Sequence, residues 1–259
     1  MPPTKTPKGH PAKGRPSAAR TSTPKRSNRR LMMIGLPIAA IAVFAGVLIA
    51  IHLSTSGGPG TPDTSNLSYV SNAKSEFAGI PSKGNVVGYA NAPVTVTEFG
   101  DLRCPVCREF DSTVIPDVLQ NLVRTHKAKI LYEHWPILGD NSVYASRAAY
   151  AAQQQNKLWE YALVVYYNQG DENSNWFTKS YARAVAYSIG LNLKKFDKDF
   201  DNTSAATASD TAVNAAASAH NFTGTPSVIV VGPKKTVDLS GITPAYSDIA
   251  KAVAKATPA

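Results

Sequence analysis

The spacing of apolar residues changes along the chain, and each spacing predicts a kind of element. Residues 94–99 place the two valines and Glu98 on one face of an extended backbone, and this alternation with a period of two predicts a strand. Residues 105–125 instead repeat large apolar side chains at every fourth position, which predicts a helix. Pro105 is compatible with the first turn of that helix, whereas Pro116 in its middle predicts a kink.

The remainder of the C-terminal region reads as a block of helices between strands. Ala-rich segments with aromatic landmarks predict helices over residues 144–155, 158–168, 176–189 and 203–220. Apolar segments bounded by turn residues predict strands over residues 129–135, 227–231 and 236–239, and a last helix covers residues 244–255. This order predicts an α/β layer fold with an inserted helical domain at about residues 141–220.

The basic excess of the chain lies in its first 30 residues. The formal net charge is +9, and residues 1–30 hold nine Lys or Arg and no acid, so the rest of the chain carries 18 basic and 18 acidic residues. Binding to nucleic acid is one interpretation of this basic, disordered tail. A solvated topology signal accounts for the same charges, because an apolar run follows directly.

Residues 31–53 contain no Asp, Glu, Lys or Arg. At about 1.5 Å per residue this segment is long enough to span the roughly 30 Å of a bilayer core. Because Lys and Arg crowd only its N-terminal flank, we expect a single-pass signal-anchor in the cell membrane, with residues 1–30 cytoplasmic and the C-terminal domain extracytoplasmic. A cleaved signal peptide is the rival interpretation. Its apolar region is usually shorter, about 7–15 residues, and ends at a small-x-small site, whereas this run ends in Ile51-His52-Leu53.

Residues 54–66 are rich in Gly, Pro, Ser and Thr and cannot bury themselves, so we interpret them as a flexible stalk. Residues 67–85 are ambiguous; they form a lead-in from which Phe77 and Ile80 are candidates to dock on the domain. We interpret residues 54–85 together as stalk and lead-in and residues 86–259 as the folded domain.

The candidate chemistry is a Cys-Pro-Val-Cys motif at the predicted start of the first helix. Cys104 and Cys107 are the only cysteines of the sequence, so it offers one thiol pair and one redox event. Three residues apart at a helix start, the two side chains share a face at a separation that a disulfide allows. There Cys104 meets unpaired backbone N–H groups and the positive end of the helix dipole, which lower its pKa from about 8.5. We expect Cys104 to be the attacking or attacked sulfur and the more buried Cys107 to resolve the mixed disulfide.

Two other interpretations of the cysteines remain open at this point. A structural disulfide that closes only four residues would stabilise the fold by about 2 kcal/mol, a poor reason to place the sole bridge there. A metal site would need two further ligands, for which His134 or His220 would have to be recruited. Arg103 and Arg108 flank the motif, either adding positive potential or lying solvated at the helix start.

Two segments carry a resemblance to a known family. Residues 91–107 read NAPVTVTEFGDLRCPVC and residues 221–232 read NFTGTPSVIVVG. Together they resemble the DsbA-like thiol:disulfide oxidoreductases of the thioredoxin superfamily, in their membrane-anchored, Gram-positive form. Residues 146–169 also resemble the inserted helical domain of that family. The resemblance covers about residues 86–256 and implies a thioredoxin-like fold interrupted by helices.

The resemblance also implies roles for single residues. Pro226 matches the cis-proline that lies against the active-site disulfide, and Thr225 would offer its backbone N–H and C=O to an extended substrate. Glu98 matches a buried acid that exchanges a proton with Cys107, although a Glu at the end of a strand that reaches solvent is another interpretation. Val106 departs from the family pattern, because the best-known members often carry His between the cysteines.

These observations predict an extracytoplasmic enzyme that donates the Cys104–Cys107 disulfide to reduced or unfolded exported proteins. No cofactor is required. The resemblance implies that a quinone-linked membrane protein of the DsbB or vitamin K epoxide reductase type reoxidises it. The alternatives are a reductase or isomerase of the same fold, and a metal-binding or chaperone module that uses the same thiols.

Overall fold

The computed structural model describes residues 61–257 of the chain. The predicted basic tail, the predicted membrane anchor at residues 31–53 and the first part of the predicted stalk lie outside these residues. Between residues 61 and 257, every helix is too short or too polar to cross a bilayer.

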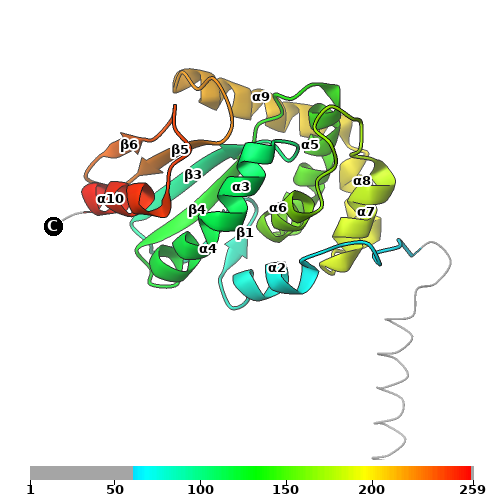
Figure 1. Cartoon of the computed structure of the whole chain (residues 1–259), viewed down its shortest axis with the longest axis horizontal. Coiled ribbons are helices and arrows are strands. Elements are labelled where there is room, and N and C mark those ends of the chain that lie inside the picture. The colour runs from blue at the N-terminus through cyan, green and yellow to red at the C-terminus, as the bar shows by residue number, and fades with distance from the viewer. Residues whose placement is uncertain (1–60, 258–259) are drawn as a thin grey trace, which may run out of the picture. The chain divides into compact units, whose positions relative to one another are not determined.

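A mixed sheet runs through the described region with the strand order β1-β2-β4-β3-β5-β6 (Figure 1). The strands are β1 (Ser82–Lys83), β2 (Val86–Val87), β3 (Val94–Gly100), β4 (Ala128–His134), β5 (Ser227–Val231) and β6 (Thr236–Asp238). Central strand β3 pairs in parallel with β4 and antiparallel with β5, so Val96 lies opposite both Ile130 and Val230. The segments predicted to be strands form this sheet, with β1 and β2 added at one edge.

The predicted helix over residues 105–125 is broken into three pieces. They are α3 (Pro105–Thr113), α4 (Ile115–Val118) and a π-helical turn, η1 (Leu119–Val123). The break falls at Val114, two residues before Pro116, because proline has no N–H to donate to the preceding turn. The predicted kink at Pro116 is therefore confirmed.

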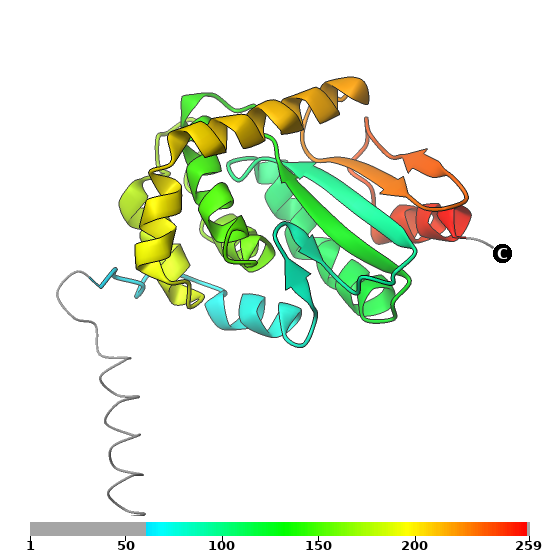
Figure 2. The same cartoon turned by 180° about the vertical axis from the view of Figure 1, so that it is seen from behind.

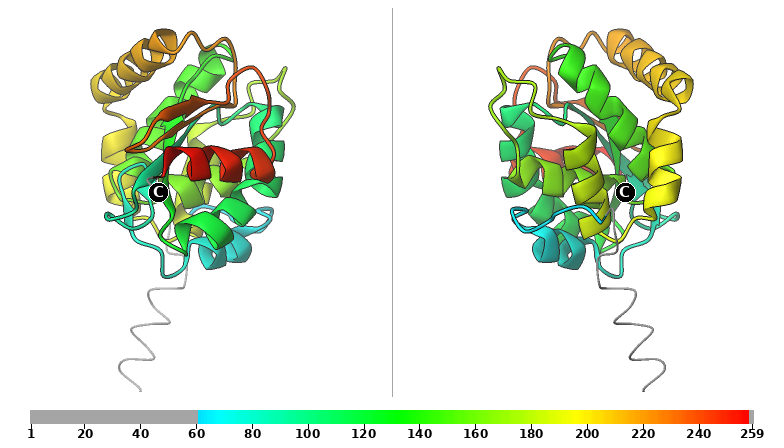
Figure 3. Two further views of the ribbon diagram at one scale, coloured as in Figure 1. Left: turned by 90° about the vertical axis from the view of Figure 1, so that its left-hand side faces the viewer. Right: turned by 90° about the vertical axis from the view of Figure 1, so that its right-hand side faces the viewer.

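Helices cover both faces of the sheet. Val96, Val228 and Val230 lie in the same core cluster as residues of α4 and of α10 (Tyr246–Ala256). On the other face, Phe99 and Ile229 form a separate cluster with Val213, Ala217 and their neighbours. Figures 2 and 3 show α9, the source of those last two residues, on the opposite side of the sheet from α10.

Five helices are inserted between β4 and β5. They are α5 (Asp140–Gln153), α6 (Leu158–Tyr167), α7 (Lys179–Ser188), α8 (Leu193–Phe200) and α9 (Thr203–Ala219). The sequence did not predict α8, because its only large buried side chains are Phe196 and Phe200 amid charged residues. Helix α7 begins at Lys179 rather than residue 176, since the side chain of Thr178 caps it by accepting a hydrogen bond from the N–H of Tyr181.

The folded region starts earlier than the predicted boundary at residue 86. Helix α2 (Val70–Phe77) and strand β1 precede it, and Ala73, Phe77 and Ile80 are buried in the main core. The ring of Phe77 lies 6.2 Å from that of Trp159 on α6. The docking of Phe77 and Ile80 on the domain is therefore confirmed, and the folded region begins before residue 86 because these few apolar side chains are buried in the main core.

Candidate active site

The two cysteines lie where β3 gives way to α3. The strand ends at Gly100, a short turn follows, and Cys104 occupies the N-cap position in an extended conformation (φ −75°, ψ 120°). Its Sγ accepts a hydrogen bond from the backbone N–H of Cys107 at 3.4 Å. Pro105 is the first residue of the helix, where its missing N–H costs nothing. Both thiols are free in the structure.

This position lowers the pKa of Cys104 to about 6. The interaction with the Cys107 thiol is the largest cause, and the Thr225 side chain and the backbone N–H groups of Cys107 and Val106 act in the same direction, against the effect of burial. Cys107 is fully buried, and that burial raises its pKa well above the ordinary thiol value. The two sulfurs are therefore chemically unequal, as the sequence predicts for a nucleophile and a resolving cysteine.

Cys104 is almost completely covered by its neighbours. The residue is 5% exposed, whereas the neighbouring Val106 is 43% exposed. The Cys104 thiol donates a hydrogen bond to the carbonyl of Thr225 at 3.5 Å, so the loop before β5 lies directly against it. The contact brings the sulfur next to the residue that precedes Pro226.

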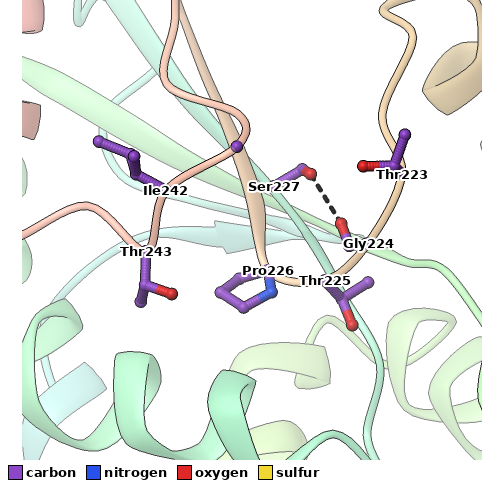
Figure 4. Close-up of a pocket in the computed structure, with 8 residues that line it drawn as sticks. Thr223, Gly224, Thr225, Pro226, Ser227, Ile242 and Thr243 are labelled. Atoms are coloured by element: carbon purple, nitrogen blue, oxygen red, sulfur yellow. Dashed lines mark hydrogen bonds between the residues drawn. The ribbon is translucent and has the colours of Figure 1, made fainter.

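The loop itself borders a groove. The Thr225–Pro226 peptide bond is cis, as the resemblance implies. A hollow of about 210 Å³ is lined by Thr223, Gly224, Thr225, Pro226, Ser227, Gly241, Ile242 and Thr243. Figure 4 shows Ile242 and Thr243 across from Pro226, and the Ser227 hydroxyl donating to the Gly224 carbonyl at 2.7 Å. The lining carries hydroxyl and apolar groups but no charge, which suits a neutral extended backbone.

Glu98 lies beneath the cysteines rather than reaching solvent. It is 1% exposed, and burial raises its pKa well above the usual carboxyl range. The second cause is Asp111 on α3, which is also 1% exposed and whose own pKa is raised to about 8, again chiefly by burial. Of the salt bridges in the described part of the chain, none involves either carboxyl. We conclude that this buried acid pair holds at least one proton at neutral pH.

Sequence reasoning missed Asp111. The available signal was its spacing, because Asp111 follows Cys107 by four residues and therefore lies one turn farther along the same helix face. Gly100 makes room for the pair, since a Cβ there would lie 2.7 Å from Oε1 of Glu98 and 3.0 Å from the hydroxyl of Tyr132.

The two arginines beside the motif have different surroundings. Arg108 is exposed. Arg103 is buried, and its guanidinium donates hydrogen bonds to the carbonyls of Leu138, Glu172 and Ser174. Arg103 is thus neither a solvated side chain nor a charge directed at the groove.

The histidines considered as metal ligands lie apart from the thiols. His134 is buried with Nε2 3.5 Å from the Ser142 carbonyl, and His220 stacks on Phe222 at 5.2 Å between ring centroids. Residues 61–257 contain no group of three or more His, Cys, Asp or Glu side chains placed to hold a metal ion.

Comparison with known proteins agrees with this geometry. A family model described as thioredoxin matches residues 82–241. A probable disulfide bond formation protein D from Bacillus cereus is 29% identical over 117 residues, which cover 44% of this chain and 54% of that protein. The chain thus spans about half the length of the curated relatives of that name that it matches.

Solved structures share the fold. The crystal structure of oxidised BdbD from Bacillus subtilis has a TM-score of 0.58 at 21% identity and covers 68% of this chain and 97% of that one. A thioredoxin-like oxidoreductase from Silicibacter pomeroyi has a TM-score of 0.52 at 30% identity, with 71% and 96% covered. The chain therefore belongs to the thioredoxin superfamily, among its thioredoxin-like oxidoreductases.

Proposed function

We propose that this chain is an extracytoplasmic oxidase that transfers the Cys104–Cys107 disulfide to exported proteins. The observation that carries the proposal is the position of the Cys104 sulfur. It lies at a helix N-terminus, has a lowered pKa, and contacts the Thr225 carbonyl at the edge of an uncharged groove. A substrate backbone laid along Thr225 would bring its own cysteine to that sulfur.

The exchange runs in two displacements. A substrate thiolate attacks Sγ of Cys104, the bond between the two active-site sulfurs breaks, and the Cys107 sulfur leaves as a thiolate. The protonated acid pair of Glu98 and Asp111 supplies a proton to this buried sulfur, whose own pKa is raised. A second substrate thiolate then attacks the substrate sulfur of the mixed disulfide and releases Cys104 as a thiolate. Two electrons pass from the substrate dithiol to the active-site disulfide.

The lowered pKa of Cys104 favours oxidation of substrates over their reduction. Stabilising the thiolate stabilises the reduced form, so the disulfide accepts electrons more readily. With a pKa of about 6, the gain at pH 7 is about 1.4 kcal/mol, or about 30 mV. This modest figure keeps a reductase as the second candidate. Equilibration with glutathione separates the two: a potential near thioredoxin's of about −270 mV supports a reductase, and one toward about −120 mV supports the oxidase.

Oxidative refolding of a reduced, unfolded protein tests the proposed activity. The full-length chain should oxidise such a substrate, and Cys104→Ser should abolish the reaction. Cys107→Ser should also abolish the oxidation, because Cys104 alone has no disulfide to donate. Mixed with a disulfide-bonded substrate instead, the Cys104 thiolate of this variant should displace one substrate sulfur and remain in a mixed disulfide, because no second active-site sulfur is left to release it. If the Cys104→Ser variant refolded the substrate as fast as the original, the assignment of the nucleophile would be wrong.

The location and the reoxidising partner are part of the same proposal. The apolar residues 31–53 and the basic flank before them support a membrane anchor with the catalytic region outside. A quinone-linked membrane protein would then return the active site to its disulfide form. Protease added to intact protoplasts should digest the catalytic region but leave the N-terminal tail, and digestion of the tail alone would reverse the assigned orientation.

A further inference from the structure

Hydrogen bonds hold the turn that carries Cys104 against the helical insertion. Some are made by side chains of the turn and some by side chains of the insertion. From the turn outward, the buried carboxylate of Asp101 accepts hydrogen bonds from the backbone N–H groups of Ile137 and Leu138 at 2.9 and 3.1 Å. It also accepts one from the Ser142 hydroxyl on α5 at 2.7 Å. Arg103 adds its three bonds to carbonyls before α5 and α7. The turn therefore cannot shift without moving the ends of these helices.

From the insertion inward, one side chain reaches the reactive residue itself. Gln169 follows the end of α6, and its Nε2 donates to the carbonyl of Leu102 at 2.9 Å and to that of Cys104 at 3.1 Å. The carbonyl of Cys104 also accepts the N–H of Arg108 at 3.1 Å, the first hydrogen bond of α3. Gln169 thus fixes the peptide plane that follows Cα of Cys104.

This contact bears on the sulfur in two ways. The orientation of that plane helps to set the extended conformation in which Sγ of Cys104 faces the N–H of Cys107. The carbonyl oxygen of Cys104 also carries partial negative charge within the same residue as the sulfur, and the amide donor bonded to it offsets that charge. Both effects favour a negative sulfur over a neutral one.

We propose that Gln169 is a positioning residue for Cys104, through which the helical insertion sets how readily the nucleophile ionises. The proposal rests on the proposed function only in taking Cys104 as the reacting sulfur. It assigns the insertion a role in the chemistry of the thiol, beyond covering the sheet.

The test compares three variants of the reduced full-length chain. Gln169→Leu removes the amide donor, and Gln169→Glu keeps the shape but places a carboxylate against the two carbonyls. Gln155→Leu is the matched control, because Gln155 bonds both the carbonyl and the N–H of Asn192, at 3.2 and 3.0 Å, within the insertion and away from the cysteines. The readout is the rate of Cys104 alkylation from pH 4 to 9 with no substrate protein present.

The midpoint of the alkylation profile should rise by about half a unit to one unit in Gln169→Leu and by more in Gln169→Glu. It should stay at the original value in Gln155→Leu. A midpoint unchanged in both Gln169 variants would overturn the proposal, as would an equal rise in the control, which would mean that any loosening of the insertion has this effect. Should Gln169→Leu fail to fold, the comparison of Gln169→Glu with the control decides.

Failure of the oxidase proposal can be told apart from failure of this one. It would appear in substrate refolding by the unaltered chain and would leave the alkylation profiles unchanged.

Discussion

Ionisation of Cys104 should stabilise the reduced protein at neutral and alkaline pH, and Cys104→Ser should remove that contribution. The pKa of Cys104 in the folded chain is about 6, below the value of about 8.5 for a thiol in an unfolded chain. Between these values the unfolded chain binds more protons than the folded one, so stability rises with pH. The contribution is complete above about pH 8.5 and is lost as the pH falls through 6.

The magnitude follows from the interval between the two pKa values. Without any discount for solvent screening, ionisation of Cys104 contributes about 1.4 kcal/mol to the unfolding free energy at pH 7 and about 3 kcal/mol near pH 9. Because Cys104 is not fully buried, we halve these figures for solvent screening, to about 0.7 and about 1.5 kcal/mol. The serine variant keeps the shape of the side chain but does not ionise in this range.

The assay is denaturant unfolding of both proteins under reducing conditions at pH 5, 7 and 9. Tryptophan fluorescence is a suitable signal, because all three tryptophans (Trp135, Trp159 and Trp176) lie in the folded region. The difference in unfolding free energy between the two proteins should grow with pH by the amounts above. A constant difference from pH 5 to 9, together with an alkylation midpoint above pH 8, would refute the reasoning.

Three further variants test the buried acids and the turn. Asp111→Asn removes a carboxyl whose raised pKa makes its ionisation costly, so denaturant unfolding should show the variant more stable than the original by up to about 5 kcal/mol at pH 8 and nearly equal to it at pH 4. Gly100→Ala would place a Cβ 2.7 Å from Oε1 of Glu98 and should lower stability by about 1–3 kcal/mol; an unchanged melting temperature would contradict the close approach. Arg103→Met leaves three carbonyls without their donor and should lower stability by about 3 kcal/mol or more, whereas Arg108→Met at an exposed position should change it little.

Local patterns in the sequence were sufficient for much of the fold. Strand β3, the start of α3 and the break before Pro116 depend on alternation, on a proline at a helix start and on a missing N–H, all of which act between near neighbours. Part of the inequality of Cys104 and Cys107 is local too, because the N-cap position supplies a hydrogen bond that favours the Cys104 thiolate. The other part is the burial of Cys107, which raises its pKa and depends on the packing of the whole domain. The cis Thr225–Pro226 bond was predicted only from the family resemblance, since a Gly-Thr-Pro segment alone predicts no more than a turn.

Where the sequence failed, burial depended on partners far along the chain. Helix α8 and residues 70–85 carry too few apolar side chains to form a recognisable pattern, yet Phe196 and Phe77 are buried against aromatic rings of α6. A pattern shows how many apolar groups a segment has. It does not show whether another segment will cover them.

The sequence by itself determined the chemistry of this protein, and the tertiary structure decided what controls it. A Cys-Pro-Val-Cys motif at a helix start places the two thiols of the sequence on one face, at a separation that a disulfide allows. Asp111 becomes the partner of Glu98, and Gln169 reaches the carbonyl of Cys104, only because α3 and the end of α6 are brought to the C-terminal end of β3. Such contacts join residues up to 65 positions apart, and proximity at that separation is a property of packing rather than of local sequence.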